Sequence, residues 1–261
     1  MIVFLVQTIK GKIVHDFAFE LERSIEYQIW RGNSDFKIEY SEIEDIKDNC
    51  KNIQDKIVPV GSIEYVKAFC NEYFNKNCEK YLKPLNIPKD LFKFANRKIS
   101  DFVLNENMDT IINDIIDISN NGQVFIKSNE VLKFENNGII HLKNILNEKK
   151  IPNGKYQISE IIQIDSEYRC FIYNGQLIGI QYYNGDFKLF PDVKIIEDIT
   201  KYFNDNTAYT IDIGVNYKGE TFLIECHEFY SCGLYGFSDY NKLPYMFNRT
   251  FNKIVNRINN G

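Results

Sequence analysis

The sequence predicts a protein of mixed α/β and α+β class, in which a small N-terminal α/β domain precedes two β-rich layers. Two features of the pattern predict this class. A strand-like run and a helical stripe follow one another near the N-terminus, and the pattern changes to paired strands from residue 123 onward. Composition agrees, because 44% of the 261 residues are hydrophobic and 15% are aromatic, which is enough for a sizeable core.

The start of the chain has the pattern of an α/β layer. Residues 1–7 form an apolar run suited to a buried strand, and residues 16–30 place apolar side chains near one helical stripe. The alternating stretch 36–44 predicts a second strand. Residues 56–74 predict a strand, a turn and a helix, for which Ser62 is the candidate N-cap.

The second half of the chain follows a segment with two of the six prolines, residues 84–102, which we expect to be a linker. After this segment, strands are predicted over residues 123–128, 138–146, 153–164 and 166–186. Asn174-Gly175 separates two alternating runs and is a strong hairpin signal. A helix over residues 191–206 and a last hairpin over residues 209–227 complete the pattern.

The composition also limits the compartment and the partners. The six cysteines are scattered, without the spacing of zinc sites, and are expected to be free thiols. Acidic and basic residues are interleaved and the net charge is −5, which disfavours a nucleic-acid surface. No apolar run approaches the roughly 20 residues that span a bilayer. We therefore expect a cytoplasmic protein with neither membrane nor nucleic acid as partner, while its oligomeric state does not follow from the sequence.

Two acidic residues interrupt the apolar pattern of the last hairpin. Asp212 and Glu225 lie in its two strands, and His227 shares a face with Glu225 because alternate residues of a strand point to the same side. Two carboxylates and an imidazole can therefore converge. Carboxylate oxygens are the ligands that Mg²⁺ uses when phosphates complete its shell. The alternative is that both acids lie at an edge and face water or a lysine.

Two lysines have the setting of phosphate contacts. Lys127 lies at the end of an apolar strand, and Lys133 follows in a polar loop that ends in glycine. A lysine in either setting can neutralise phosphate oxygens. The alternative is that both are simply solvated, as most lysines are.

The connector between two predicted strands carries further polar groups. Glu160 leaves one strand and is followed by Ile161 and Ile162, while Glu167 and Arg169 share a face of the next strand. Such a connector can lay backbone amides and carbonyls against a purine and offer a carboxylate to ribose hydroxyls. The alternative is a cross-strand pair of Glu167 and Arg169 that stabilises the sheet.

Taken in order along the chain, these residues resemble the ATP-grasp superfamily of carboxylate-amine ligases over roughly residues 95–240. The stretches PVGS, FIKS, SEYRCFIYNG and IECHEFYSCGLYG are similar to a poorly characterised clade of this superfamily, which is known for a shared arginine and two lysines. The lysines would be Lys127 and Lys133, and the arginine would be Arg169 or Arg97.

The resemblance implies an ATP-grasp fold in which two β-rich layers clasp ATP. It implies an N-terminal domain over residues 1–94 and an ATP-grasp domain over residues 95–261. Within the second domain, about 122–183 would form the small nucleotide-binding subdomain and 184–261 the metal-binding part.

The resemblance also implies roles for single residues. Lys127 and Lys133 would contact the phosphates of ATP, and Glu167 would contact the ribose. Near adenine it places the side chain of Glu160 and the backbone of Ile161 and Ile162. Ser231, Gly233 and Tyr235, in the loop 229–240, would select the substrate. A nucleophilic role is not expected for Cys232, because free cysteines are usually buried and inert.

For metal binding the resemblance implies Asp212 and Glu225. Where the family usually has Glu-x-Asn, the third residue is His227 here. An imidazole suits Mg²⁺ less well than an amide oxygen does, so His227 is open as a metal ligand, as a contact to phosphate or substrate, or as a packed core histidine. Arg169 or Arg97 would stabilise the charged oxygens of the reaction.

The activity that the resemblance implies is ligation that depends on ATP and magnesium. A carboxylate would be joined to an amine through an acylphosphate, with a small molecule, a peptide or a protein as substrate. The alternatives are a nucleotide-binding module without turnover and an ATP-dependent kinase. We expect Asp212→Asn and Glu225→Gln to fold normally and to lose magnesium-dependent nucleotide binding.

Overall fold

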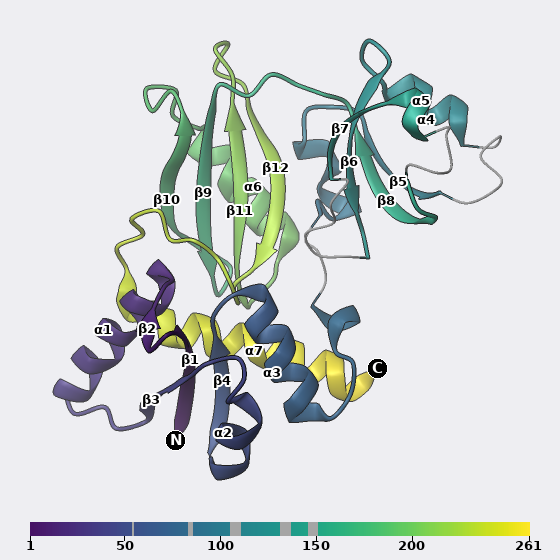
Figure 1. The fold of residues 1–261 in the computed structure, drawn as a ribbon. Coiled ribbons are helices and arrows are strands. Elements are labelled where there is room, and N and C mark those ends of the chain that lie inside the picture. The colour runs from purple at the N-terminus through teal and green to yellow at the C-terminus, as the bar shows by residue number, and fades with distance from the viewer. Residues whose placement is uncertain (54, 83–85, 105–110, 131–136, 146–150) are drawn as a thin grey trace.

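Three four-stranded sheets and the helices packed on them make up the computed structural model (Figure 1). It describes residues 1–53, 55–82, 86–104, 111–130, 137–145 and 151–261. The prediction of a mixed α and β fold is confirmed. No helix in the described part of the chain combines the length and the apolar character that crossing a bilayer requires.

The N-terminal sheet is a short α/β layer. Its strands are β1 (Ile2–Ile9), β2 (Lys12–Ile13), β3 (Phe36–Ser41) and β4 (Lys56–Val60). Parallel β3 and β4 flank β1 on its two sides, while β2 pairs with it antiparallel. The helices are α1 (Asp16–Trp30), α2 (Ile46–Asn52) and α3 (Ile63–Phe74). The predicted N-cap is confirmed, because the Ser62 hydroxyl accepts a hydrogen bond from the amide of Tyr65.

The small sheet is antiparallel and has its own core. Its order is β5 (Ile99–Leu104), β8 (Gly154–Ser159), β6 (Gln123–Ser128) and β7 (Gly138–His141). Helices α4 (Ile112–Ile118) and α5 (Leu142–Ile145) belong to the same part of the chain. Its buried side chains, among them Val124, Ile126 and Ile158, form a separate cluster.

Three expectations for this region are wrong in part. The segment 84–102 is not a plain linker, because it holds the 3₁₀ helix η2 (Lys89–Phe94) and the start of β5, which pairs with β8. The strand expected over residues 138–146 ends at His141, where α5 begins. The strand expected over 153–164 ends at Ser159, because the chain leaves the small sheet there and crosses to the next one.

The central sheet is antiparallel, with the order β10 (Gln176–Gly185), β9 (Ser166–Tyr173), β11 (Ala208–Val215) and β12 (Thr221–Glu228). Both predicted hairpins are confirmed. In the first, Asn174 and Gly175 have φ values of 52° and 71°, as a two-residue turn that follows the strand twist requires. The predicted helix is α6 (Val193–Phe203), and it packs its apolar stripe on one face of this sheet.

The last helix returns to the first domain. Helix α7 (Leu243–Asn260) follows the 3₁₀ helix η4 (Tyr240–Lys242), and a third such turn, η1 (Glu79–Tyr81), lies between the first domain and the small sheet. Phe247 and Phe251 of α7 share one buried cluster with Phe4 and Phe69 of the N-terminal layer. Figure 1 shows α7 running alongside α3 and β4, below the central sheet. The N-terminal layer therefore obtains part of its core from the end of the chain.

Candidate active site

A cleft of about 300 Å³ lies between the small sheet and the edge strand β12 of the central sheet. Its wall is mostly apolar, with side chains such as Phe125, Ile139 and Ile224. A few ionisable groups, Arg97, Lys127, Glu160, Glu167 and Glu225, also line it. An apolar cleft with a few placed polar groups has the character of a small-molecule site.

The predicted nucleotide residues meet at this cleft. Lys127, Glu160, Ile161, Ile162 and Glu167 all line it. The connector 160–165 crosses from β8 to β9, so its backbone forms part of the wall (Figure 1). Its entrance is fixed by a backbone hydrogen bond of 2.8 Å from Glu160 N to Lys98 O. The other predicted lysine, Lys133, lies outside the described residues.

Glu167 is held by β10 and not by Arg169. The Tyr183 hydroxyl donates to Glu167 Oε2 at 2.9 Å, and the Asn184 amide donates to Oε1 at 2.6 Å. The alternative of a cross-strand pair between Glu167 and Arg169 is therefore wrong. Burial, with the nearby Asp212 and Glu167 carboxylates, raises the pKa of Tyr183, so its phenol stays protonated and keeps donating.

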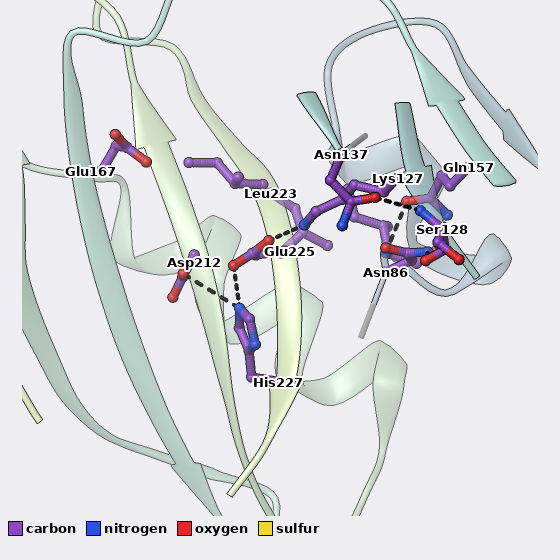
Figure 2. Close-up of polar contacts among 12 residues, drawn as sticks. Asn86, Lys127, Ser128, Asn137, Gln157, Glu167, Asp212, Leu223, Glu225 and His227 are labelled. Atoms are coloured by element: carbon purple, nitrogen blue, oxygen red, sulfur yellow. Dashed lines mark hydrogen bonds and ion pairs between the residues drawn. The ribbon is translucent and has the colours of Figure 1, made fainter. Parts of the chain in front are cut away.

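A chain of charges links the two sheets across the cleft (Figure 2). Lys127 of β6 donates to Glu225 Oε2, and His227 contacts the other oxygen, Oε1, of the same carboxylate. The His227 Nε2 atom also lies 3.6 Å from Asp212 Oδ2. Glu225 does face a lysine from the edge strand, as one alternative expected, but that lysine is itself a predicted site residue.

The charge chain sets the protonation of its members. Burial alone would raise the pKa of Glu225, but His227 and Lys127 lower it well below its usual range. Burial alone would lower the pKa of His227, but its contacts with Asp212 and Glu225 raise it to about 9. At neutral pH the imidazole is therefore a cation between two carboxylates. His227 is not the packed core histidine considered from the sequence, since 30% of its side chain is exposed.

Asp212 has a buried partner of its own. Arg169 donates from Nε to Asp212 Oδ1 and from Nη2 to Oδ2, both at 2.8 Å. The side chains are 3% and 11% exposed for Asp212 and Arg169 respectively, and β11 is an interior strand. The expectation that Asp212 lies at an edge facing water or a lysine is therefore wrong. Arg169 also reaches Gly233 O at 3.4 Å, which connects the pair to the loop after β12.

A bulge in β12 turns Glu225 toward the cleft. Asp212 pairs with Glu225 and Ile213 pairs with Leu223, so Ile224 is the extra residue. The extra residue shifts the alternation, and both Leu223 and Cys226 pack on the α6 side while Glu225 and the cleft lie on the other side.

Arg97 holds the bulge in place. Its Nη1 donates to Leu223 O at 2.9 Å and to Ala95 O at 3.1 Å, and its Nη2 donates to Ile224 O at 3.4 Å. Burial lowers the pKa of Arg97 to about 10, and the guanidinium remains charged at neutral pH. Of the two arginines considered, Arg97 lines the cleft and Arg169 lies on the side of the metal-ligand candidates.

Arg97→Met is expected to lower the free energy of unfolding by about 1.5–3 kcal/mol, the usual contribution of hydrogen bonds to a charged group. The loss arises because the carbonyls of the bulge lose their donor. Urea unfolding followed by circular dichroism measures it, with Arg23→Met on the exposed face of α1 as the matched control. Unchanged stability together with weakened ATP binding would instead show that Arg97 acts on the ligand.

The predicted substrate loop is anchored on two sides. Tyr235 stacks on Tyr183 with ring centroids 5.0 Å apart, and the Leu234 amide donates to Asp16 Oδ2 of α1 at 2.8 Å. Ser231 is half-buried in the same loop, and Gly233 supplies the carbonyl that Arg169 contacts. The loop therefore lies between the central sheet and the first domain, beside the charged cluster.

Two further observations concern residues of this region. Tyr183 was not predicted, because it is the extra residue at a bulge in β10, where strand alternation no longer indicates which side chains share a face. Cys232 is buried, its thiol donates to Glu228 O, and burial raises its pKa, so it is no thiolate nucleophile.

Asp212, Glu225 and His227 have the composition of a metal site. One ligand atom from each lies within 4.8 Å of the others, and no other such group of acidic, histidine or cysteine side chains occurs in the described ranges. Two carboxylates suit a divalent cation. The donor set therefore fits a metal ion that has its remaining ligands supplied by phosphates.

Comparison with known proteins agrees with this geometry. The fold is similar to D-alanine–D-alanine ligase from Bacillus anthracis (TM-score 0.55, 13% identity, 98% of this chain and 99% of that chain). It is also similar to D-cycloserine synthetase (TM-score 0.58, 10% identity, 98% and 99%). A third similar structure is N5-carboxyaminoimidazole synthetase from Staphylococcus aureus complexed with ADP (TM-score 0.57, 10% identity, 95% and 77%).

At these identities the structures establish the fold, and the expected ATP-grasp architecture is confirmed. No curated protein matches the chain. Residues 94–243, more than half of the chain, match an ATP-grasp domain family, which is family 2 of the clade known for a shared arginine and two lysines. The chain thus belongs to this second family of the arginine and two-lysine clade of ATP-grasp proteins.

Proposed function

We propose that the protein is an ATP- and magnesium-dependent ligase that joins a carboxylate to an amine through an acylphosphate. The observation that carries the proposal is the position of the charged chain Lys127–Glu225–His227–Asp212 at the mouth of the apolar cleft. An apolar pocket for a base and a charged site for phosphates are the two halves of a nucleotide site.

Each residue at the cleft has a role in this proposal. Lys127 neutralises phosphate oxygens, and Glu167 accepts hydrogen bonds from the ribose. Glu160 and the backbone of Ile161 and Ile162 lie along the adenine. Lys133 is proposed as a second phosphate contact on the same grounds as in the sequence. We also retain the proposed domains, 1–94 and 95–261, with subdomains 122–183 and 184–261.

The metal ligands are Asp212 and Glu225, with His227 beside them. A divalent ion held there would supply positive charge next to the terminal phosphates. The protein has to release Glu225 from Lys127 when phosphates arrive, because both the lysine and the ion need access to the same region. Arg97 maintains the backbone shape that presents Glu225, and Arg169 holds Asp212 in one orientation.

The reaction follows from these contacts in two steps. A substrate carboxylate oxygen attacks the γ-phosphorus of ATP, the bond to the bridging oxygen breaks, and ADP leaves. An amine nitrogen then attacks the acyl carbon, inorganic phosphate leaves, and the nitrogen loses a proton. The product is an amide.

The substrates are a carboxylate and an amine that meet beside the loop 229–240. Among similar folds, two are named for D-alanine–D-alanine ligation and D-cycloserine synthesis, which favours small amino-acid-like substrates. A peptide or protein substrate stays part of the proposal. Ser231, Gly233 and Tyr235 are the proposed contacts.

A second candidate is a nucleotide-binding module without turnover. It is favoured by one observation: Lys127 and His227 already neutralise Glu225. Incubation with ATP, carboxylates and amines separates the candidates by mass spectrometry. An amide with ADP supports ligation, a phosphorylated substrate supports a kinase, and bound ATP without product supports the module.

Glu225→Gln is expected to reduce the magnesium dependence of ATP binding by about tenfold or more, since even residues that only orient metal ligands contribute that much. Calorimetric titration of ATP with and without magnesium measures the effect. The matched control is Glu220→Gln, an exposed acid near the turn of the same hairpin. Equal magnesium dependence in wild type and Glu225→Gln would refute the assigned metal site, and no ATP binding in the wild type would refute the proposed function.

A further inference from the structure

His227 occupies a particular place among the ligand candidates. It lies two residues after Glu225 on β12, and its Nε2 atom points at oxygens of both acids (Figure 2). The other atoms of those carboxylates are already used. Arg169 binds both oxygens of Asp212, and Lys127 binds Glu225 Oε2.

The remaining acceptor capacity therefore converges on one point. A carboxylate oxygen can accept two hydrogen bonds or metal bonds. Asp212 Oδ2 has one lone pair left beside its bond from Arg169, and Glu225 Oε1 contacts only His227 among the described hydrogen bonds. Both of these oxygens face the same imidazole nitrogen. One oxygen from each acid and one nitrogen are thus available for a single ion.

A donor set of two oxygens and one imidazole nitrogen discriminates between metal ions. Mg²⁺ is a hard cation that prefers oxygen ligands and keeps its waters, whereas imidazole suits first-row transition ions. Thiolate donors would select softer ions, but Cys226 packs on the opposite, α6 side of the sheet. Carboxylates and phosphates also suit Mn²⁺, which leaves Mn²⁺ as the ion that accepts all donors of this site.

We propose that Asp212, Glu225 and His227 select a first-row transition metal ion of the Mn²⁺ type over Mg²⁺, with His227 Nε2 as a direct ligand. The inference rests on the proposed function for the identity of the nucleotide, since ATP phosphates would complete the shell. The coordination by His227 can be tested without any nucleotide.

The first measurement is electron paramagnetic resonance of the wild-type protein with Mn²⁺ alone. Binding removes the signal of the hydrated ion, and a pulsed experiment detects the coupling of the electron spin to a ligating ¹⁴N nucleus. We expect this nitrogen coupling in the wild type and in His141→Asn, which changes an exposed histidine on β7. We expect it to be lost in His227→Asn.

The second measurement is competition of Mg²⁺ against Mn²⁺, in the presence and absence of ATP. The preference for Mn²⁺ is expected to fall by about tenfold or more in His227→Asn, because asparagine supplies an oxygen in place of the nitrogen. His227→Gln, with a longer amide, should behave in the same way. Circular dichroism confirms that both variants fold.

The outcomes separate this inference from the proposed function. Mn²⁺ binding without nitrogen coupling in the wild type, or an unchanged metal preference in both variants, would overturn the inference and leave the ligase proposal standing. Nitrogen coupling from His227 without any ATP binding would support the metal assignment and remove the ligase proposal. No Mn²⁺ binding at all would overturn the inference.

Discussion

Asp212→Asn is expected to lower the free energy of unfolding by about 3–5 kcal/mol, the usual cost of removing one partner of a buried ion pair. Arg169 would remain charged in a site where its own side chain is 11% exposed. Asparagine offers one acceptor oxygen where the carboxylate offers two, so one of the two 2.8 Å hydrogen bonds is lost together with the charge. Chemical denaturation measures the loss directly.

The control is the double variant Arg169→Met with Asp212→Leu. Replacing both partners of a buried pair by apolar side chains is often neutral or stabilising, so the double variant should recover most of the stability. An Asp212→Asn curve that coincides with the wild-type curve would contradict the prediction. The structure therefore changes the expectation that Asp212→Asn folds normally, whereas for Glu225→Gln, with a 20% exposed side chain, that expectation stays.

Lys127→Met is expected to weaken ATP binding by about 10- to 150-fold, which corresponds to about 1.5–3 kcal/mol for hydrogen bonds to a charged group. Methionine keeps the length and the apolar stem of the side chain and removes the ammonium. The effect is the difference between two terms, because wild-type Lys127 has to leave Glu225 before it contacts a phosphate. We expect the phosphate term to dominate, since a triphosphate carries several charges and Glu225 carries one.

Calorimetry at two salt concentrations checks this prediction. Binding to wild type should weaken with salt more steeply than binding to Lys127→Met, because screening acts on the lost charge contact. Lys194→Met on α6, a lysine 77% exposed, is the matched control. An affinity within about threefold of wild type would show that Lys127 serves the cleft only through Glu225.

The order of the strands and most site residues could be predicted from the sequence. Lys127, Glu167 and Glu225 each follow from local patterns, because strand alternation and strand ends are properties of neighbouring residues. Their convergence at one cleft depends on how two sheets face each other, which no local pattern contains.

Bulges and long-range partners account for most of what the sequence did not reveal. Tyr183 and Ile224 are extra residues that shift the alternation, and nothing in their local pattern marks them. The pairing of Arg169 with Asp212 links residues 43 positions apart, so the expected partner Glu167, two positions away, was the wrong one. Similarly, the packing of α7 on the first domain joins the two ends of the chain.

This return of α7 has a consequence for synthesis on the ribosome. The N-terminal layer ends its third helix at Phe74, but the side chains of Phe247 and Phe251 that complete its core are translated much later. At about 5–20 residues per second, the intervening chain takes roughly 10–30 s to make. During that interval the nascent layer exposes apolar surface that α7 will cover, which makes it a natural client for chaperones that bind unfinished chains.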